Sequence, residues 1–474
     1  LLQKQNRKWL ELEKYYGKNN MTLTRKPKIQ MSDHTEGDVN LSPRRTAWAE
    51  DHIHESTAQI LAEDAHFFLH QSLSTPCLNV ITESDGIFIT DVQGRQIMDF
   101  HGNSVHQVGY GNQRVIDAMK AQLDKLPFCP RRYTNQVAID LARRLAQLAP
   151  GRLNKMLFTP GGTSAIGMAL KLARYATGRH KTISMWDSFH GASLDAISIG
   201  GESLFRKGVG PLLPGTEHIP PPTRGKCHFN CADENHTGCV DYLEYVLEME
   251  GDVGAIIAEP MRWTTVELPP KTYWQRVREI CDRHNVLLIF DEIPSALGRT
   301  GKMFVCEHFD VIPDMLVIGK GLGGGVFPLA ALIVNEDLDV VGDRALGHYT
   351  HEKSSVGCAA ALATLDCLYE DGLIENAVEL GRQGMARLAD MKTRFPLIRD
   401  VRGLGLFFGI DLWLDNEPAR DQADEVLYHS LSRGLSYKVG GGSVLTLCPP
   451  MTITSDELTT ALDIIEEGIA SVSE

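Results

Sequence analysis

Two stretches of this sequence end in residues that could do chemistry together. The apolar run 286–290 is short and rich in β-branched and aromatic residues, which is typical of a buried parallel strand, and Asp291 follows it directly. A second apolar run, 315–319, ends on Lys320 and continues as Gly-Leu-Gly-Gly-Gly. The carboxyl ends of neighbouring strands in an open α/β sheet face one crevice, so we expect a carboxylate and an amine to converge there.

This combination suits pyridoxal phosphate. That cofactor forms a Schiff base with a lysine and needs an anionic partner for its pyridine nitrogen, and these roles fit Lys320 and Asp291. The glycines after Lys320 would let a large flat group approach the amine. Taken singly, the two residues would more often be a surface lysine and a helix cap, but their positions at two strand ends favour the cofactor site. A Walker-type nucleotide loop is excluded because Gly321 follows the lysine in place of Ser or Thr.

A glycine-rich loop could bind a phosphate. Residues 159–164 read TPGGTS and lie between a predicted strand at 155–158 and a predicted helix at 165–176. A loop that leads into a helix amino terminus offers backbone N–H groups and a favourable dipole to an anion, and Thr163 adds a hydroxyl. Many such loops are only tight turns. The strand before and the helix after are the context that phosphate binding requires.

Composition limits the class of protein. At 474 residues with 43% hydrophobic residues, the chain can build a large core and is expected to hold two domains. The formal net charge of −14 argues against a nucleic-acid or anionic-membrane partner. No apolar run approaches the length of a membrane span. Ten cysteines are too sparse and irregular for a disulfide scaffold and no secretory signal is recognisable, so we expect reduced thiols in a cytoplasm.

The order of predicted elements indicates an α/β protein. Strands alternating with helices predict a mostly parallel sheet with helices on both faces. We assign 1–30 to an extension outside the fold, 31–100 to the N-terminal part of a small domain, 101–346 to a large cofactor-binding domain and 347–474 to the C-terminal part of the small domain. Further predicted segments are helices at 46–70, 114–126 and 137–148, a hairpin at 87–100 that turns at 93–94, and strands at 182–186, 254–258, 330–334, 405–412 and 444–447.

One short segment gathers possible metal ligands, namely Cys227, His228, Cys231, His236 and Cys239. Zinc accepts these residue types, but their spacing matches none of the familiar paired motifs. A reduced surface loop is therefore the default interpretation and no metal is assigned. A structural metal is the alternative.

With these pieces in order, the chain from about residue 45 to its end resembles the class III pyridoxal-phosphate-dependent aminotransferases. The motifs that carry the resemblance occur in the family's order: GGTSAIGMALKLAR, FHG, AEP, DE with GRTGK, the lysine-glycine segment and HYT. The resemblance implies fold type I, with a large domain built on a mostly parallel sheet and a smaller α/β domain from both chain ends. It also implies a homodimer with the active site at the subunit interface, where Thr350 would reach the cofactor phosphate of the neighbouring subunit.

The family's cofactor-binding residues can be placed on matching positions. By resemblance, Lys320 is the Schiff-base lysine and Asp291 the partner of the pyridine nitrogen. Gly162 and Thr163 would hold the phosphate, and Phe189 of the FHG motif would stack on the ring.

The chain departs from the family pattern where aminotransferases bind carboxylates. An arginine usually stands shortly before the final Pro-Pro, and here that position is Thr446; another often follows the FHG motif, and here it is Ala192. The segment after the AEP motif, which usually supplies a glutamine and a glutamate gate, reads Arg-Trp-Thr at 262–264, and Pro294 replaces a glutamine near the cofactor. Losing a bidentate carboxylate clamp weakens binding. Amino acids with 2-oxoglutarate are therefore a poor substrate pair for this sequence.

Within the family, the local sequences DEIPSALGRTGKMF and GHYTHEKSSVGCAAAL most resemble the (R)-1-hydroxy-2-aminoethylphosphonate ammonia-lyase branch. The resemblance implies an ammonia-lyase that converts a small β-hydroxy amine bearing a phosphonate to phosphonoacetaldehyde and ammonia. Arg131, Arg132 and Arg262 are candidates to bind the phosphonate, although each could equally be a solvated surface arginine. The alternatives are an ω-aminotransferase of small amines with an unusual amino acceptor, and a non-catalytic binding protein that keeps the fold.

Overall fold

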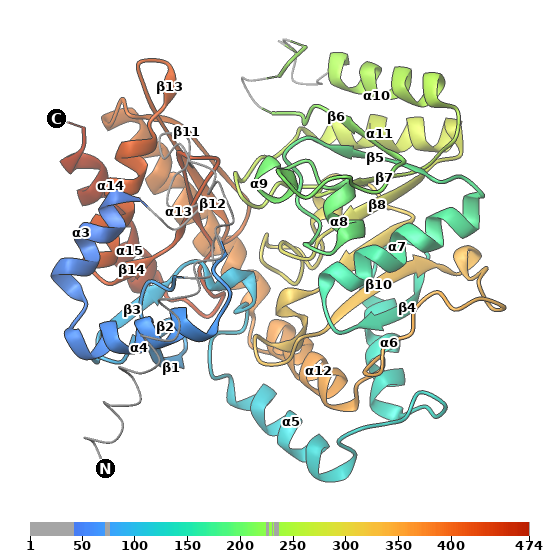
Figure 1. The fold of residues 1–474 in the computed structure, drawn as a ribbon, viewed down its shortest axis with the longest axis horizontal. Coiled ribbons are helices and arrows are strands. Elements are labelled where there is room, and N and C mark those ends of the chain that lie inside the picture. Colours follow the sequence, from blue (N-terminus) through green and yellow to red (C-terminus); the bar gives the residue numbers. More distant parts are fainter. Residues whose placement is uncertain (1–41, 72–75, 224–226, 230, 232–236, 474) are drawn as a thin grey trace, which may run out of the picture. The chain divides into compact units, whose positions relative to one another are not determined.

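The computed structural model describes residues 42–71, 76–223, 227–229, 231 and 237–473 (Figure 1). All the elements below belong to the unit Thr35–Glu474. The predicted extension at 1–30 lies outside the described residues.

A seven-stranded sheet forms the centre of the larger part of the molecule, in the order β4-β10-β9-β8-β7-β5-β6. Its strands are β4 (Leu153–Thr159), β5 (Lys181–Met185), β6 (Thr216–Ile219), β7 (Val253–Ala258), β8 (Leu287–Asp291), β9 (Met315–Ile318) and β10 (Ala330–Asn335). β10 runs antiparallel to β4 and to β9, while the pairings among β5 to β9 are parallel. The predicted mostly parallel sheet is confirmed, and β6 is a strand that the sequence pattern did not indicate.

The central strands are apolar throughout because both faces of the sheet are covered. Along β8, Ile289 belongs to a core cluster with α7 (Gly162–Thr177), whereas Leu288 and Phe290 point into the main core on the other face, which includes α11 (Lys271–His284). Successive side chains of a strand point to opposite faces, so a continuous apolar run satisfies two helix layers at once. α7 ends at Gly178, whose φ of 67° is left-handed, as the sequence predicted.

The single helix predicted at 46–70 is instead two helices, α3 (Pro43–His52) and α4 (Glu55–Phe67). The break is held from outside the segment. Gln93, at the turn of the predicted hairpin, accepts hydrogen bonds through Oε1 from the His54 backbone N–H at 3.1 Å and from Thr57 Oγ1 at 2.9 Å. Local periodicity cannot reveal such a contact, so the helix prediction was wrong in its continuity.

The two ends of the described chain pair in a second region (Figure 1). Its first sheet, in the order β1-β2-β3-β14, consists of β1 (Ile81–Asp85), β2 (Phe88–Asp91), β3 (Gln96–Asp99) and β14 (Leu435–Ser436), with β14 parallel to β3. Its second sheet is antiparallel and consists of β11 (Ile398–Gly403), β12 (Phe408–Leu414), β13 (Glu417–Pro418), β15 (Lys438–Gly440) and β16 (Val444–Leu447). The hairpin of β2 and β3 confirms the predicted turn.

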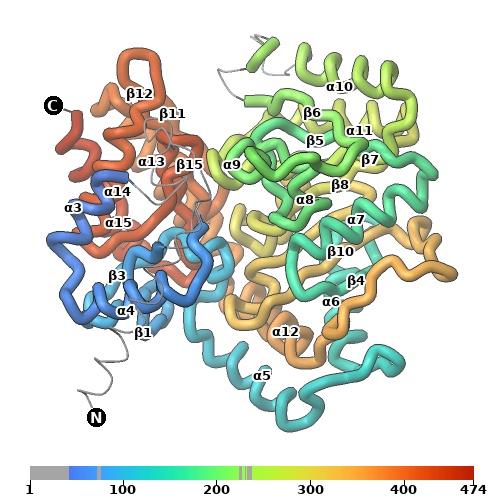
Figure 2. The backbone as a smooth tube through the Cα atoms, viewed as in Figure 1, coloured from blue at the N-terminus to red at the C-terminus, as the bar shows by residue number. Residues whose placement is uncertain are grey.

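The remaining helices cover these sheets or join the two regions. They are α5 (Gln113–Lys125), α6 (Gln136–Leu148), α8 (Leu194–Ile199), α9 (Ser203–Arg206), α10 (Thr237–Glu250), α12 (Ser355–Glu370), α13 (Leu373–Arg394), α14 (Arg420–Ser432) and α15 (Ser455–Ser471), with short 3₁₀ turns η2 (Gly102–Ser104), η3 (Val305–His308), η4 (Lys320–Gly323) and η5 (Glu336–Leu338). Figure 2 shows α12 running beside α5 and α6, which it contacts. Among the described helices, none combines the length and apolarity needed to cross a bilayer. The domain boundaries at 100 and 346 remain predictions.

Candidate active site

Lys320 stands at the carboxyl end of β9, where the chain turns sharply into η4. Its φ of 45° is left-handed, which is unusual for a residue with a side chain and marks a backbone held by its surroundings. A Cβ on the next residue, Gly321, would lie 1.9 Å from Gln107 Oε1, so any larger residue there would have to displace the buried Gln107 side chain. The Lys320 Nζ lies 4.6 Å from the centroid of the Trp263 ring. The turn therefore places one amine at a defined point against an aromatic surface.

The surroundings of Lys320 make its ammonium easier to deprotonate. Burial lowers its pKa from the ordinary value, while the negative charges of Glu259 and Asp291 act in the opposite direction. The positive charge of Lys438 adds to the lowering. A lysine with a lowered pKa is a better nucleophile and proton acceptor than one on the surface.

Asp291, at the end of β8, is only 2% exposed and is held by two hydrogen bonds. Its Oδ2 lies 2.8 Å from Nδ1 of His190, and its Oδ1 accepts from the Ile293 backbone N–H at 3.1 Å. His190 is buried too, and within the described residues its Nε2 has no hydrogen-bond partner. The carboxylate is therefore fixed in position. The sequence identified Asp291, but it identified His190 only as the second residue of the FHG motif.

The amino terminus of α7 meets these strand ends. Its N-cap, Gly161, makes no side-chain capping bond, so the first backbone N–H groups of the helix are not capped by a side chain. A Cβ on Gly162 would lie 2.6 Å from Ile293 Cδ1, and a Cβ on Gly191 would lie 2.4 Å from Thr163 Oγ1. The first turn of α7 thus lies against both the segment after Asp291 and the FHG motif. We call Gly162, Thr163, His190, Asp291 and Lys320 the strand-end cluster.

These side chains and backbone groups fit pyridoxal phosphate. The cofactor needs an amine for covalent attachment, a carboxylate for its ring nitrogen and an anion site for its phosphate. Lys320, Asp291 and the amino terminus of α7 offer these three chemistries, because a helix amino terminus favours a phosphate. Phe189 is half-buried beside them, with its ring 4.3 Å from that of Phe205 between centroids. Its stacking on the cofactor remains a prediction.

Three predicted site residues lie apart from this cluster. Arg131 and Arg132, between α5 and α6, and Thr350, before α12, are exposed. The two loops that carry them pack together: the rings of Phe128 and His351 are 5.3 Å apart, and Asn135 Nδ2 donates to the Lys353 carbonyl at 3.0 Å. We call Arg131, Arg132 and Thr350 the loop surface. Within one chain it faces solvent.

Arg262 is surrounded by carboxylates. It pairs with Glu259, its Nη2 lies 3.2 Å from Glu202 Oε2, and its Nε lies 4.0 Å from Asp187 Oδ2. Burial opposes its charge, but these three carboxylates raise its pKa above the ordinary value. Desolvation raises the pKa of Asp187 to about 6, although half of that side chain is exposed. The charge of Arg262 is therefore already balanced by carboxylates of the same chain.

Two residues near Lys320, Trp263 and Lys438, were not predicted as site residues. Trp263 is 7% exposed, and the Nζ of Lys438 lies 5.5 Å from the centroid of its ring, so two ammonium groups border one indole. Thr446, at the position of the missing arginine, is buried and donates through Oγ1 to the Thr264 carbonyl at 2.8 Å. This hydroxyl is therefore used within the fold. Trp263 had been noted only as a departure from the family pattern.

Known proteins of one enzyme family are similar to this chain. The family model described as aminotransferase class-III matches residues 70–469. An (R)-1-hydroxy-2-aminoethylphosphonate ammonia-lyase from Vibrio splendidus (strain 12B01) is 48% identical over 472 residues, which cover 95% of this chain and 98% of that protein. A leucine/methionine racemase from Thermococcus litoralis is 34% identical, covering 88% and 96%. Among solved structures, a pyridoxal-phosphate-bound amine transaminase from an uncultivated Pseudomonas species matches with a TM-score of 0.80 and 31% identity, covering 85% of this chain and 98% of that one.

Proposed function

The chain belongs to the class III aminotransferase family, and from this premise we propose that it is a pyridoxal-phosphate-dependent ammonia-lyase acting on (R)-1-hydroxy-2-aminoethylphosphonate. The products would be phosphonoacetaldehyde and ammonia. The observation that carries the proposal is the near-full-length similarity to the Vibrio splendidus ammonia-lyase. Thr446 supports the proposal, because it occupies the position where an aminotransferase would carry a carboxylate-binding arginine. Its hydroxyl is hydrogen-bonded within the fold.

The residues of the strand-end cluster would hold the cofactor. Lys320 would bind it covalently through Nζ, Asp291 would hold the proton on its ring nitrogen, and the α7 amino terminus with Gly162 and Thr163 would bind its phosphate. Phe189 would lie against its ring. Once bound, pyridoxal phosphate supplies an electron-withdrawing ring that acidifies the C–H bond next to the substrate nitrogen.

Lys320 is the group placed to move protons. With its pKa lowered by burial, Nζ can accept the proton from the carbon next to nitrogen and, as an ammonium, return a proton to the departing β-hydroxyl. The water lost in this elimination is regained when the released product hydrolyses to the aldehyde and ammonia. Atoms balance without an oxidant or reductant, so no amino acceptor is required.

We assign the phosphonate to cations near the reacting carbon. A dianion of this kind is bound most strongly by charge-assisted hydrogen bonds. Lys438 is one candidate, because its Nζ borders the same indole as Lys320. Arg131 and Arg132 are the others if a partner subunit brings them to the site. Arg262 is the weakest of the arginine candidates, because Glu259 and Glu202 already contact it.

We further propose that the enzyme works as a cytoplasmic homodimer. The loop surface supports a dimer, because Phe128 and Tyr133 beside its arginines are 41% and 67% exposed. Large exposed apolar patches mark contacts with another chain, and these two side chains would contribute to one. None of the ten cysteines forms a disulfide, which is in keeping with a reducing compartment.

The decisive experiment concerns the amino acceptor. Enzyme given (R)-1-hydroxy-2-aminoethylphosphonate alone is expected to release ammonia over many turnovers, and added 2-oxoglutarate or pyruvate is expected to leave the rate unchanged. 2-Aminoethylphosphonate, which lacks the β-hydroxyl, is the matched control and should release none. If ammonia were absent, the cofactor accumulated in its amine form and turnover returned only with a keto acid, the enzyme would be an ω-aminotransferase.

A further inference from the structure

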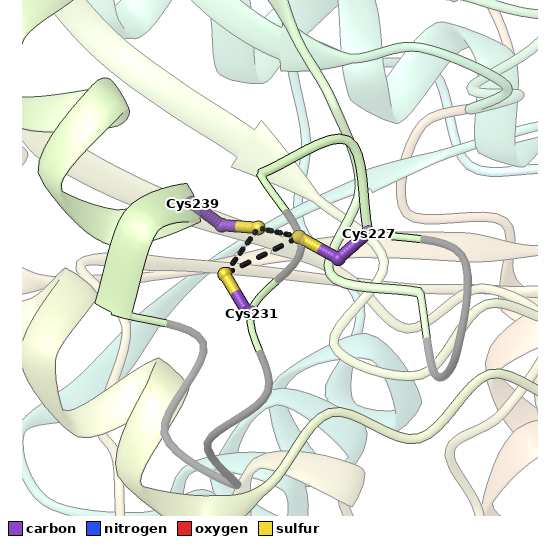
Figure 3. Close-up of side chains that lie close together, drawn as sticks. All are labelled: Cys227, Cys231 and Cys239. Atoms are coloured by element: carbon purple, nitrogen blue, oxygen red, sulfur yellow. Dashed lines mark hydrogen bonds between the residues drawn. The ribbon is translucent and has the colours of Figure 1, made fainter.

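Three cysteines from separate stretches of the chain meet beside the large sheet (Figure 3). Cys227 and Cys231 lie between β6 and α10, and Cys239 lies in the first turn of α10. The Cys227 Sγ lies 3.3 Å from that of Cys231 and 2.8 Å from that of Cys239, and the Sγ atoms of Cys231 and Cys239 are 3.7 Å apart. All three sulfurs therefore point at one place.

We propose that Cys227, Cys231 and Cys239 bind a structural zinc ion. Thiolates about 2.3 Å from tetrahedral zinc lie about 3.8 Å from one another, and two of the three separations approach that value. A disulfide would join only two sulfurs and leave the third unused, whereas a metal uses all three. Zinc takes four ligands; the described residues supply three of them, and the proposal concerns these three.

The local packing brings the ligands together. Gly238 directly precedes Cys239, and a Cβ there would lie 2.9 Å from Phe229 Cβ and 3.4 Å from Cys231 Sγ. Glycine at this position therefore lets the segment around Cys231 approach the start of α10. Cys227 and Cys239 are 8% and 2% exposed, which shields their bonds to a metal from water.

The ion would brace part of the active-site surroundings. Pro221 and Thr223, a few residues before Cys227, line a cavity that also includes Glu259 and Arg262. By tying the chain after β6 to α10, zinc would hold that wall of the cavity. The role is structural, since no cysteine of the cluster lines the cavity.

Metal analysis of the holoenzyme tests the proposal. Enzyme purified without an affinity tag and dialysed against metal-free buffer is expected to keep about one zinc per chain by plasma mass spectrometry. X-ray absorption at the zinc edge should show sulfur neighbours at about 2.3 Å. Cys231→Ser and Cys239→Ser should each reduce the zinc content to below about a tenth of the wild-type value. Cys129→Ser, outside the cluster, is the matched control and should retain it.

Wild-type enzyme alone can overturn the proposal, even if the variants fail to fold. A chain that keeps its cofactor but lacks zinc, carries another metal in its place, or shows only nitrogen and oxygen around zinc would contradict it. So would a Cys227–Cys239 disulfide found by mass spectrometry of unreduced peptides. Zinc with sulfur neighbours in the wild type, lost in either cluster variant but not in the control, would establish the site.

Discussion

The strand-end cluster and the loop surface carry most of the predicted site residues, and they differ in how far one chain completes them. In the strand-end cluster, contacts within the chain hold two of the groups: Asp291 is hydrogen-bonded to His190, and Gly321 lies against Gln107 beside Lys320. In the loop surface, Arg131 and Thr350 face solvent. Proton transfer requires placement that rigid strand ends provide, whereas an anion-binding arginine can come from a second chain. We therefore expect the reacting groups to come from one chain and the anion-binding arginines from the other chain of the proposed dimer.

The strand-end cluster is broken most severely by Lys320→Ala. We expect kcat to fall at least about a thousandfold, because the amine proposed for both attachment and proton transfer is lost. Borohydride reduction followed by mass spectrometry should attach the cofactor to the wild type and not to the variant. Lys171→Ala, at an exposed position on α7, is the control and should behave as wild type. Turnover by the Lys320 variant within a few-fold of wild type would remove this residue from the mechanism.

Asp291→Asn tests the anionic half of the same cluster. The amide keeps the shape of the side chain but not its charge, so kcat should fall about 100-fold while cofactor is still bound. The bound cofactor is measured by its absorbance and kcat by ammonia release. Asp117→Asn, on the exposed face of α5, should leave both unchanged. An active Asp291 variant would mean that the carboxylate serves the fold through His190 and not the reaction.

The loop surface should respond in KM and not in kcat. Arg131→Ala or Arg132→Ala is expected to raise KM for the phosphonate about tenfold, the effect of one lost charge-assisted contact. Arg143→Ala, an exposed arginine paired with Asp140, is the control.

Arg262→Ala should chiefly lower the melting temperature, because it leaves neighbouring carboxylates without their counter-charge. If KM were unchanged in the Arg131, Arg132 and Arg262 variants, the anion site would lie elsewhere.

Mixed dimers decide whether the loops act across subunits. A Lys320→Ala chain is combined with an Arg131→Ala, Arg132→Ala double variant by unfolding and refolding together or by co-expression. In each hybrid, one site then has its own Lys320 and the intact loops of the other chain. Activity at low substrate concentration should recover to about a quarter of wild type, since about half of the dimers are hybrids with one good site. No recovery above the sum of the parents would show that the loops serve their own chain.

The smallest expected effect concerns Lys438. Its positive charge helps lower the pKa of Lys320, so Lys438→Met should raise that pKa. A base must be neutral to accept a proton, and the acidic limb of the kcat profile should therefore move to higher pH. Lys438→Arg should keep the wild-type limb. If the Met variant changed KM for the phosphonate and left the limb in place, Lys438 would be a substrate-binding residue alone.

The sequence by itself determined the parts of this protein that depend on local order. The apolar runs before Asp291 and Lys320 predict buried strands. Both strands end within one residue of the predicted position, because a strand covered on two faces must be apolar until it reaches the crevice. The glycine-rich loop before α7 was predicted because the change from a strand pattern to a helix pattern occurs over consecutive residues. The resemblance in motif order then identified the family, which the comparisons show.

Only the tertiary structure decided what lies next to what. His190 stands 101 positions before Asp291, yet it is hydrogen-bonded to that carboxylate. Gln93 accepts a hydrogen bond from Thr57, 36 positions earlier, just after the break in the predicted helix. Arg262 contacts Glu202, which lies 60 positions earlier in the chain. The three cysteines were expected to form an ordinary loop, and their sulfurs converge because Gly238 allows two segments to touch. Such contacts depend on the closure of the whole chain around its sheets, and a pattern with a period of two to four residues carries no information about them.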